Sequence, residues 1–172
     1  ADFVIATSSG ANKVIYCDGG NDKDSLPELE NEDIGDDSDS TTVHVHDVDG
    51  DGDLDLFVGG RVVGGKYPTT PDTYLLRNEG GRFIDVTDVA ALGLKQTGMV
   101  TSALFTDVDN DGQSDLLVAH EWGPVKYYHN SSGKFTDQTE AAGLAELTGW
   151  WNSLASADFD LDGDLDYVVG NF

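Results

Sequence analysis

The chain is built from short apolar runs that recur between polar, glycine-containing turns. Apolar residues are continuous in Leu56–Val58, Leu116–Val118 and Tyr167–Val169, and they alternate with polar residues in Val43–His46. Short apolar or alternating runs bounded by turn residues are typical of strands, and a 3.6-residue helical period is absent apart from single turns. The pattern therefore predicts an all-β protein.

Further strands are predicted between these runs, in an order that repeats along the chain. Each apolar run is followed by a second strand, a glycine-containing turn and a third strand, and a fourth strand leads to the next polar loop. The predicted second strands are Tyr74–Arg77 and Val125–His129, and the third strands are Phe83–Val86 and Phe135–Gln138. The predicted fourth strands are Val100–Phe105 and Asn152–Ala157. The predicted fold is about three β-propeller-type blades of four antiparallel strands each.

Self-comparison shows that these units are repeats. The segments Asp47–Gly59, Asp107–Ala119 and Asp158–Gly170 superimpose without gaps, and their first aspartates are 60 and then 51 residues apart. Asn78–Thr87 also aligns with Asn130–Thr139. A period of about 40–50 residues is typical of propeller blades, whereas helical solenoids repeat at about 34.

The repeat predicts one domain over residues 1–172, with blade-like units at approximately 1–53, 54–113 and 114–172. An acidic insertion, Asp22–Asp39, carries nine acidic residues and one lysine in the first unit. We expect it to be solvated and mobile, with a weak cation site as the alternative. Ala1 leads directly into the strand-like Phe3–Ala6, and three blades cannot close a ring. We therefore expect a fragment of a longer propeller, or a homo-oligomer that closes through open blade edges.

Charge restricts the classes of partner. The chain has 33 acidic and 9 basic residues, a formal net charge of −24. This sign excludes nucleic acid and anionic membrane surfaces as partners, because both are bound through Lys and Arg. No run of 18 apolar residues is present, so no membrane insertion is expected. Fourteen of the 33 acidic residues lie in the three superimposable segments, which calls for a local explanation.

Each of these segments begins with a nine-residue loop that has carboxylates at its first, third, fifth and ninth places and glycine at its sixth. Four carboxylates so close together repel one another unless a cation lies between them. Ca²⁺ takes six to eight oxygen ligands, whereas Mg²⁺ demands stricter octahedral geometry and Zn²⁺ prefers His or Cys, which the loops lack. We predict three Ca²⁺ sites. The side-chain ligands are Asp47, Asp49, Asp51, Asp55, Asp107, Asp109, Asp111, Asp115, Asp158, Asp160, Asp162 and Asp166, with backbone oxygens from Asp53, Gln113 and Asp164.

An EF-hand begins with similar residues but is excluded. Its loop needs an acidic residue at the twelfth place and a helix on either side. The twelfth places here are Val58, Val118 and Val169, inside predicted strands.

The loop pattern DxDxDGxxD followed by an apolar strand resembles the FG-GAP/VCBS repeat of integrin α-subunit propellers and many bacterial surface proteins. The turn Asn-x-x-Gly-(Arg/Lys)-Phe-x-Asp, at Asn78–Asp85 and Asn130–Asp137, is similar to the bacterial and cartilage-acidic-protein branch. The resemblance implies a β-propeller with Ca²⁺ loops between outer blade strands. It also implies an extracellular, cell-surface or periplasmic location and a role in adhesion or in recognition of a protein or glycan ligand.

Several other residues admit two interpretations. His44 and His46 share one face of a strand, as either a metal pair or structural residues. Trp122, Trp150 and Trp151 lie at strand ends, either packed between blades or on a ligand-binding rim. Asn130 begins an N-x-S/T acceptor pattern in a predicted turn.

The sequence contains no GxSxG or HExxH motif, so we expect no enzymatic activity. The alternative is a part, catalytic or not, of a secreted polysaccharide-acting enzyme.

Overall fold

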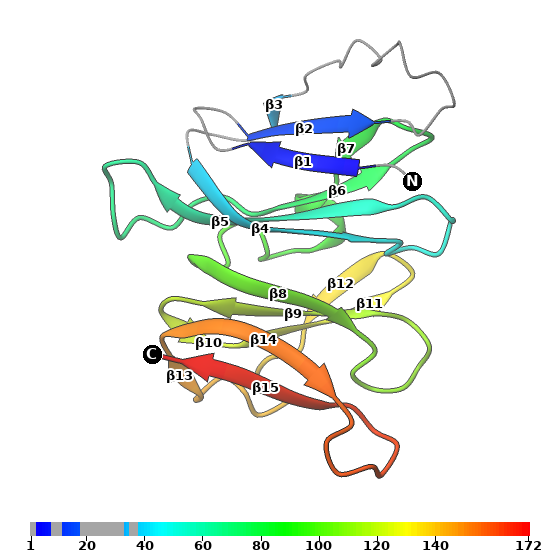
Figure 1. The fold of residues 1–172 in the computed structure, drawn as a ribbon, viewed down its shortest axis with the longest axis vertical. Helices are drawn as coiled ribbons and strands as arrows, with labels where there is room; N and C mark the ends of the chain where they lie inside the picture. The colour runs from blue at the N-terminus through cyan, green and yellow to red at the C-terminus, as the bar shows by residue number, and fades with distance from the viewer. Residues whose placement is uncertain (1–2, 8–11, 18–32, 35–37) are drawn as a thin grey trace.

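The computed structural model describes residues 3–7, 12–17, 33–34 and 38–172, with side chains from residue 42 onward, and confirms the all-β fold (Figure 1). Helix α1 (Thr87–Ala90) is the one α-helix in this part of the chain. None of the described helical segments is long and apolar enough to cross a membrane.

The first complete blade-like sheet contains β4, β5, β6 and β7 in that spatial order, all antiparallel. Its register pairs Leu56 with Leu76 and Phe57 with Leu75. Its strands are β4 (Ser38–His46), β5 (Asp55–Val63), β6 (Tyr74–Asn78) and β7 (Phe83–Asp85).

A second four-stranded sheet repeats this arrangement in the order β8, β9, β11 and β12. Its register pairs Leu116 with Tyr128 and Leu117 with Tyr127, as the repeat predicts. Its strands are β8 (Val100–Thr106), β9 (Asp115–His120), β11 (Lys126–Ser131) and β12 (Lys134–Asp137).

Smaller sheets flank the two complete ones, and the described residues form no closed ring. One flanking sheet has the order β1–β2–β3, and the other pairs β14 with β15. A short ribbon, β10–β13, accompanies the second complete sheet. These strands are β1 (Phe3–Thr7), β2 (Asn12–Cys17), β3 (Asp33–Ile34), β10 (Gly123–Pro124), β13 (Thr148–Gly149), β14 (Trp151–Ala157) and β15 (Asp166–Asn171).

The sheets begin and end at other points of the chain than the predicted sequence units. Each acidic loop lies inside a sheet, between its first and second strands, whereas the predicted units 54–113 and 114–172 begin where a loop ends. The reason is that a short loop between antiparallel neighbours forms a hairpin within one sheet. The strand predicted to be the fourth of one unit is therefore the first strand of the next sheet. Most of the predicted insertion, residues 22–39, lies outside the described residues, apart from β3 and the start of β4.

The continuous apolar runs are explained by burial on both faces of a sheet. Successive strand residues point to opposite faces. Leu56 and Val58 join a cluster on one face of the first sheet, and Phe57 joins the main core between the two complete sheets. None of the three is more than 1% exposed. Gly59 allows the sheets to approach, since a Cβ there would lie 2.7 Å from a methyl group of Val100.

A row of hydrogen-bonded polar groups is buried around His120, the last residue of β9 in the second complete sheet. His120 is 2% exposed. Its Nδ1 lies 3.2 Å from the carbonyl oxygen of Pro124, and its Nε2 lies 3.2 Å from the hydroxyl oxygen of Thr97. Thr97 lies in turn 2.9 Å from the Tyr128 hydroxyl. Burial lowers the pKa of His120 to about 4, against the opposing effect of the hydrogen bond to Pro124, and burial raises the pKa of Tyr128 to about 12.

We predict that His120 makes the fold acid-sensitive between pH 6.5 and 4. The unfolded chain binds a proton at His120 in this range and the folded chain does not, so the contribution is complete above pH 6.5 and is lost as the pH falls towards 4. The loss amounts to about 3 kcal/mol. Urea unfolding at several pH values would measure it. His120→Gln, which cannot be protonated, should flatten the pH dependence relative to wild type, and an unchanged dependence would contradict the assignment.

Candidate metal centres

Three acidic loops connect the first two strands of their sheets. Loop 1 is Asp47–Asp55 between β4 and β5, loop 2 is Asp107–Asp115 between β8 and β9, and loop 3 is Asp158–Asp166 between β14 and β15. Figure 1 shows all three on the same edge of the molecule. The hairpin connection thus places every predicted metal-binding residue on one edge.

The three loops share one set of internal hydrogen bonds. The first aspartate accepts from the backbone N–H of the sixth residue, glycine, at 3.0, 2.9 and 3.0 Å in loops 1, 2 and 3. The fifth aspartate accepts from the seventh N–H at 2.8, 2.8 and 3.0 Å. The sixth glycine has φ values of 95°, 88° and 100°, which glycine adopts without a steric penalty. Glycine at the sixth place therefore provides the sharp turn of each loop.

The ninth aspartate closes each loop onto its own beginning. Asp55, Asp115 and Asp166 accept the N–H of the second loop residue at 2.9, 3.0 and 2.9 Å. Asp55 and Asp115 are 1% and 0% exposed, and each also accepts an N–H from the third strand of its sheet at 2.8 Å. Burial raises the pKa of Asp55, and the backbone hydrogen bonds from Asn78 and Val48 oppose that shift.

The first, third and ninth carboxylates converge in every loop. In each group the oxygen atoms lie within 4.8 Å of one another. The groups are Asp47, Asp49 and Asp55 in loop 1, Asp107, Asp109 and Asp115 in loop 2, and Asp158, Asp160 and Asp166 in loop 3. These donors are hard oxygens, as Ca²⁺ requires. In loop 3, Asp158 Oδ1 is shielded from solvent and accepts no hydrogen bond, which leaves a buried oxygen available to a cation.

The fifth and seventh positions lie differently. Asp51 and Asp162 fall outside these groups, whereas Asp111 lies in a second group with Asp109 and His129. The seventh residues, from which we expected backbone oxygens as ligands, also have side chains that accept hydrogen bonds at the loop surface. Asp53 accepts from Gly80 N at 3.2 Å, Gln113 from Ser132 N at 2.6 Å and Asp164 from Asn110 Nδ2 at 3.3 Å. Asp and Gln thus each provide an acceptor oxygen at this position.

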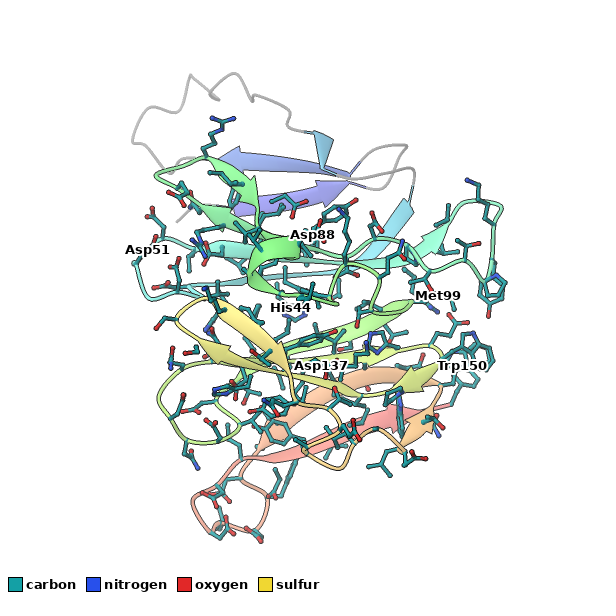
Figure 2. The ribbon with its side chains drawn as sticks, turned by 180° about the vertical axis from the view of Figure 1, so that it is seen from behind. His44, Asp51, Asp88, Met99, Asp137 and Trp150 are labelled. Atoms are coloured by element: carbon teal, nitrogen blue, oxygen red, sulfur yellow. The ribbon has the colours of Figure 1, made fainter. Side chains whose placement is uncertain are left out.

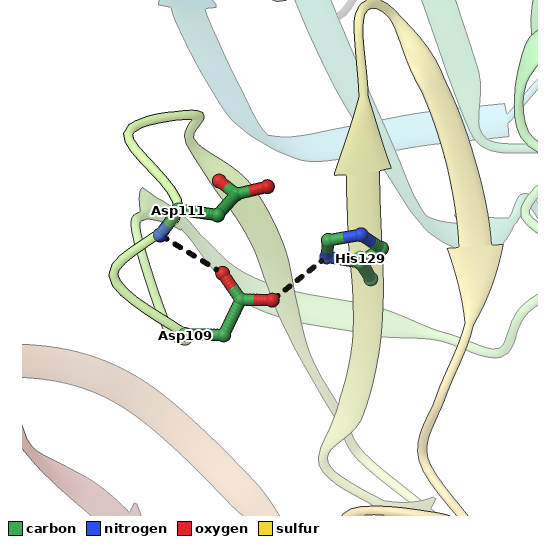
Figure 3. Close-up of side chains that lie close together, drawn as sticks. All are labelled: Asp109, Asp111 and His129. Carbon is green, nitrogen blue, oxygen red and sulfur yellow. Dashed lines mark hydrogen bonds and ion pairs between the residues drawn. The ribbon is translucent and has the colours of Figure 1, made fainter.

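A nitrogen-bearing side chain that the repeat alignment did not predict lies at each of the first two loops. Arg77 Nε lies 3.0 Å from Asp49 Oδ2, and His129 Nδ1 lies 3.3 Å from Asp109 Oδ2 (Figure 3). Both residues stand in the third strand of their sheets, immediately before the aligned asparagine. Because one is Arg and the other His, the alignment of the repeats gave no signal for them.

The aligned asparagines, Asn78 and Asn130, hold each loop to the hairpin beside it. Asn130 Nδ2 donates to the carbonyl oxygens of Ser114 and Val48, both at 2.9 Å, and its Oδ1 accepts from Gly133 N at 2.9 Å. Asn130 is 2% exposed. Its buried, hydrogen-bonded amide is therefore not accessible for glycosylation in the folded chain. The recurrence of this asparagine in both repeats was the signal for its role.

Neighbouring loops are linked through the same hairpins. Val48 belongs to loop 1, so the bond from Asn130 joins the second sheet to the loop of the first. Gly133 lies so close to loop 1 that a Cβ there would be 2.6 Å from the Cβ of Asp49. Asn110 in loop 2 donates to Asp164 in loop 3 at 3.3 Å. The loops thus form a connected row along the edge.

The strand histidines pack against aromatic rings. The His46 ring stacks on Phe105 at 4.9 Å between centroids, and the His44 ring lies 6.5 Å from that of Phe57. Burial lowers the pKa of His44. Neither residue belongs to a group of potential metal ligands among the described side chains, so the structural interpretation is the better supported.

Two of the three tryptophans are exposed at the surface, and the third is packed against other residues. Trp122 and Trp150 are 55% and 39% exposed, with ring centroids 4.9 Å apart. Trp151 is half-buried and borders an apolar cavity of about 400 Å³ between the second complete sheet and β14–β15. Figure 2 places Trp150 on the edge opposite Asp51 of loop 1.

Comparison with known families agrees with this architecture. Residues 107–169 match the family model of the FG-GAP-like repeat, from the first aspartate of loop 2 into β15. No curated protein matches the chain.

We predict that Leu161 strains loop 3. Its φ is 63°, in the left-handed region, where the equivalent residues of loops 1 and 2 are Gly50 and Asn110. A bulky residue in this conformation costs about 1–2 kcal/mol. Because Leu161 is 86% exposed, little packing offsets that cost. Leu161→Asn should raise the free energy of unfolding by about 1 kcal/mol in urea titrations. Asn110→Leu in loop 2 should lower it, and equal stability of all three proteins would contradict the prediction.

Proposed function

We propose that each of the three loops binds one Ca²⁺ ion and that the ions hold together the blades of this FG-GAP-like repeat module. The observation that carries the proposal is the convergence of the first, third and ninth carboxylates in all three loops, on a common backbone geometry. Four acidic groups per loop without a cation would repel one another, whereas a divalent ion with six to eight oxygen ligands relieves that repulsion.

The proposed role of Ca²⁺ is structural. The loops join strands within a sheet and are linked to one another across sheets, as the Asn130–Val48 bond shows. An ion at such a place stabilises the arrangement of blades. We propose that the loops bind Ca²⁺ with a Kd on the order of 10⁻⁴–10⁻³ M or tighter, as extracellular modules do. Such an affinity suits an extracellular, cell-surface or periplasmic location.

We predict that EDTA lowers the Tm and that Ca²⁺ restores it. At about 2 mM Ca²⁺ and a Kd of about 10⁻⁴ M, each site contributes about 1.8 kcal/mol. Three sites then raise the Tm on the order of 10 °C. Differential scanning calorimetry would measure this shift, and isothermal titration calorimetry should give three ions per chain.

Replacing the aspartate at the third place of each loop would show which loop binds which ion. Asp49→Asn, Asp109→Asn and Asp160→Asn should each reduce the stoichiometry from three to two. Glu140→Gln removes one exposed negative charge outside the loops and serves as the control. A wild-type Tm that does not respond to Ca²⁺ would overturn the proposal.

We further propose that the module recognises a ligand through an exposed aromatic cluster formed by Tyr67, Trp122, Trp150 and Phe172. Trp150 lies between Trp122 and Phe172, with ring centroids 4.9 and 5.8 Å away. The Trp122 indole donates to the Tyr67 hydroxyl at 3.1 Å, and that hydroxyl donates to Glu121 at 2.8 Å. Fixed, exposed aromatic rings are typical of binding hot spots, and their flat faces suit a glycan as well as a protein ligand.

We predict that Trp122→Ala and Trp150→Ala reduce ligand binding about tenfold or more without changing Ca²⁺ stoichiometry. Phe159→Ala is the matched control, because Phe159 is 59% exposed but lies in loop 3, on the other edge. A glycan array, with a hydrolysis assay beside it, would identify the ligand and test for turnover. Binding that neither tryptophan variant weakens would contradict this placement, and turnover would favour the polysaccharide-acting alternative.

We also propose that the chain self-associates through open blade edges. The outer edge of β15 pairs with no strand among the described residues, and Val168 on this strand is 53% exposed. An edge of this kind is a template for pairing with another chain.

A further inference from the structure

His129 makes loop 2 chemically different from loop 1. Arg77 and His129 occupy equivalent places in β6 and β11, and each reaches the third carboxylate of its loop. Arginine stays protonated and offers no lone pair, so at loop 1 it can only neutralise charge. A neutral imidazole has a free nitrogen lone pair and is the commonest protein ligand for metal ions.

The Nδ1 atom of His129, in β11, lies against two carboxylates of loop 2. It is shielded from solvent and makes no hydrogen bond of acceptable geometry. Asp109 Oδ2 lies 3.3 Å from it and Asp115 Oδ1 lies 3.2 Å from it, both at ion-pair distance. When His129 is neutral and its proton is on Nε2, the Nδ1 lone pair faces these oxygens, and a cation shared with them would relieve the repulsion.

The spacing of the donors suits a small transition-metal ion. Ligand atoms of Asp109, Asp111 and His129 lie within 4.8 Å of one another, and the imidazole contacts Asp109 (Figure 3). Metal–ligand bonds of about 2.0–2.1 Å in tetrahedral geometry place the donors about 3.3 Å apart. The distance between His129 Nδ1 and Asp109 Oδ2, 3.3 Å, is close to that value, and Asp111 lies within the 4.8 Å limit of the group.

A cavity beside this group provides room for a further ligand. It has a volume of about 360 Å³ and is bordered by Asp109, His129, Tyr127 and Gln138. An ion held by three protein donors therefore has space for water or a small exogenous ligand at its remaining position.

We infer that loop 2 also binds a borderline divalent transition-metal ion, such as Zn²⁺ or Co²⁺, through Asp109, Asp111 and His129, in competition with Ca²⁺. Imidazole nitrogen favours such ions, whereas a site of oxygen donors alone favours Ca²⁺, Mg²⁺ or Mn²⁺. The inference shares with the proposed function the premise that loop 2 is a cation site, but it does not require loops 1 and 3 to bind Ca²⁺.

The test is a titration with Zn²⁺ by calorimetry and with Co²⁺ by visible absorption, using the intact chain. Wild type should bind one Zn²⁺ through nitrogen and oxygen ligands, and the Co²⁺ complex should show intense tetrahedral bands. His129→Gln should weaken Zn²⁺ binding at least about tenfold and abolish those bands. Arg77→His, which places an imidazole at the equivalent position of loop 1, should create a second site of the same kind.

Controls separate this inference from the Ca²⁺ proposal. The double variant His44→Gln/His46→Gln removes both imidazoles of β4, in the first sheet, and should leave the Co²⁺ bands unchanged. Ca²⁺ titrations of wild type and His129→Gln should give equal stoichiometry. Zn²⁺ affinity that is the same in wild type and His129→Gln would overturn the inference, whatever the Ca²⁺ result. Zn²⁺ binding lost in His129→Gln supports it, even if no Ca²⁺ binds.

Discussion

A buried carboxylate at the start of the second strand organises each complete sheet. Asp55 and Asp115 are almost fully buried, and a charge in that environment is tolerated only when hydrogen bonds compensate for lost hydration. Each receives one N–H from its own loop and one from the third strand of its sheet. The loop and two strands are therefore fixed relative to one another, and the remaining acidic side chains of the loop project from a rigid frame.

The same frame connects neighbouring blades. The hairpin of the second complete sheet reaches loop 1 through Asn130, and loop 2 reaches loop 3 through Asn110. In repeat proteins, stability arises from each unit and from the interface to the next. Here the acidic loops contribute to both, so a cation bound in one loop would strengthen contacts on either side of it.

The fold separates two kinds of surface. Hairpin connections between first and second strands bring the acidic loops to one edge, and the opposite edge carries the exposed aromatic cluster (Figure 2). This separation would allow the proposed structural ions and the proposed ligand to bind without competing for the same residues. Loop 2 differs from the other two loops, because His129 adds an imidazole nitrogen to its carboxylate oxygens.

The sequence by itself determined the strands, the three loops and the convergence of their first, third and ninth carboxylates. These features depend on residues within about a dozen positions of one another, as in the apolar run Leu56–Val58 or the glycine at the sixth loop place. Only the tertiary structure decided which strands share a sheet, and so the phase of the blades. It also placed His129 against Asp109, buried the amide of Asn130 and brought Trp122 to Trp150. Those contacts join residues about 20 to 80 positions apart, and through-space packing between strands, rather than local periodicity, sets them.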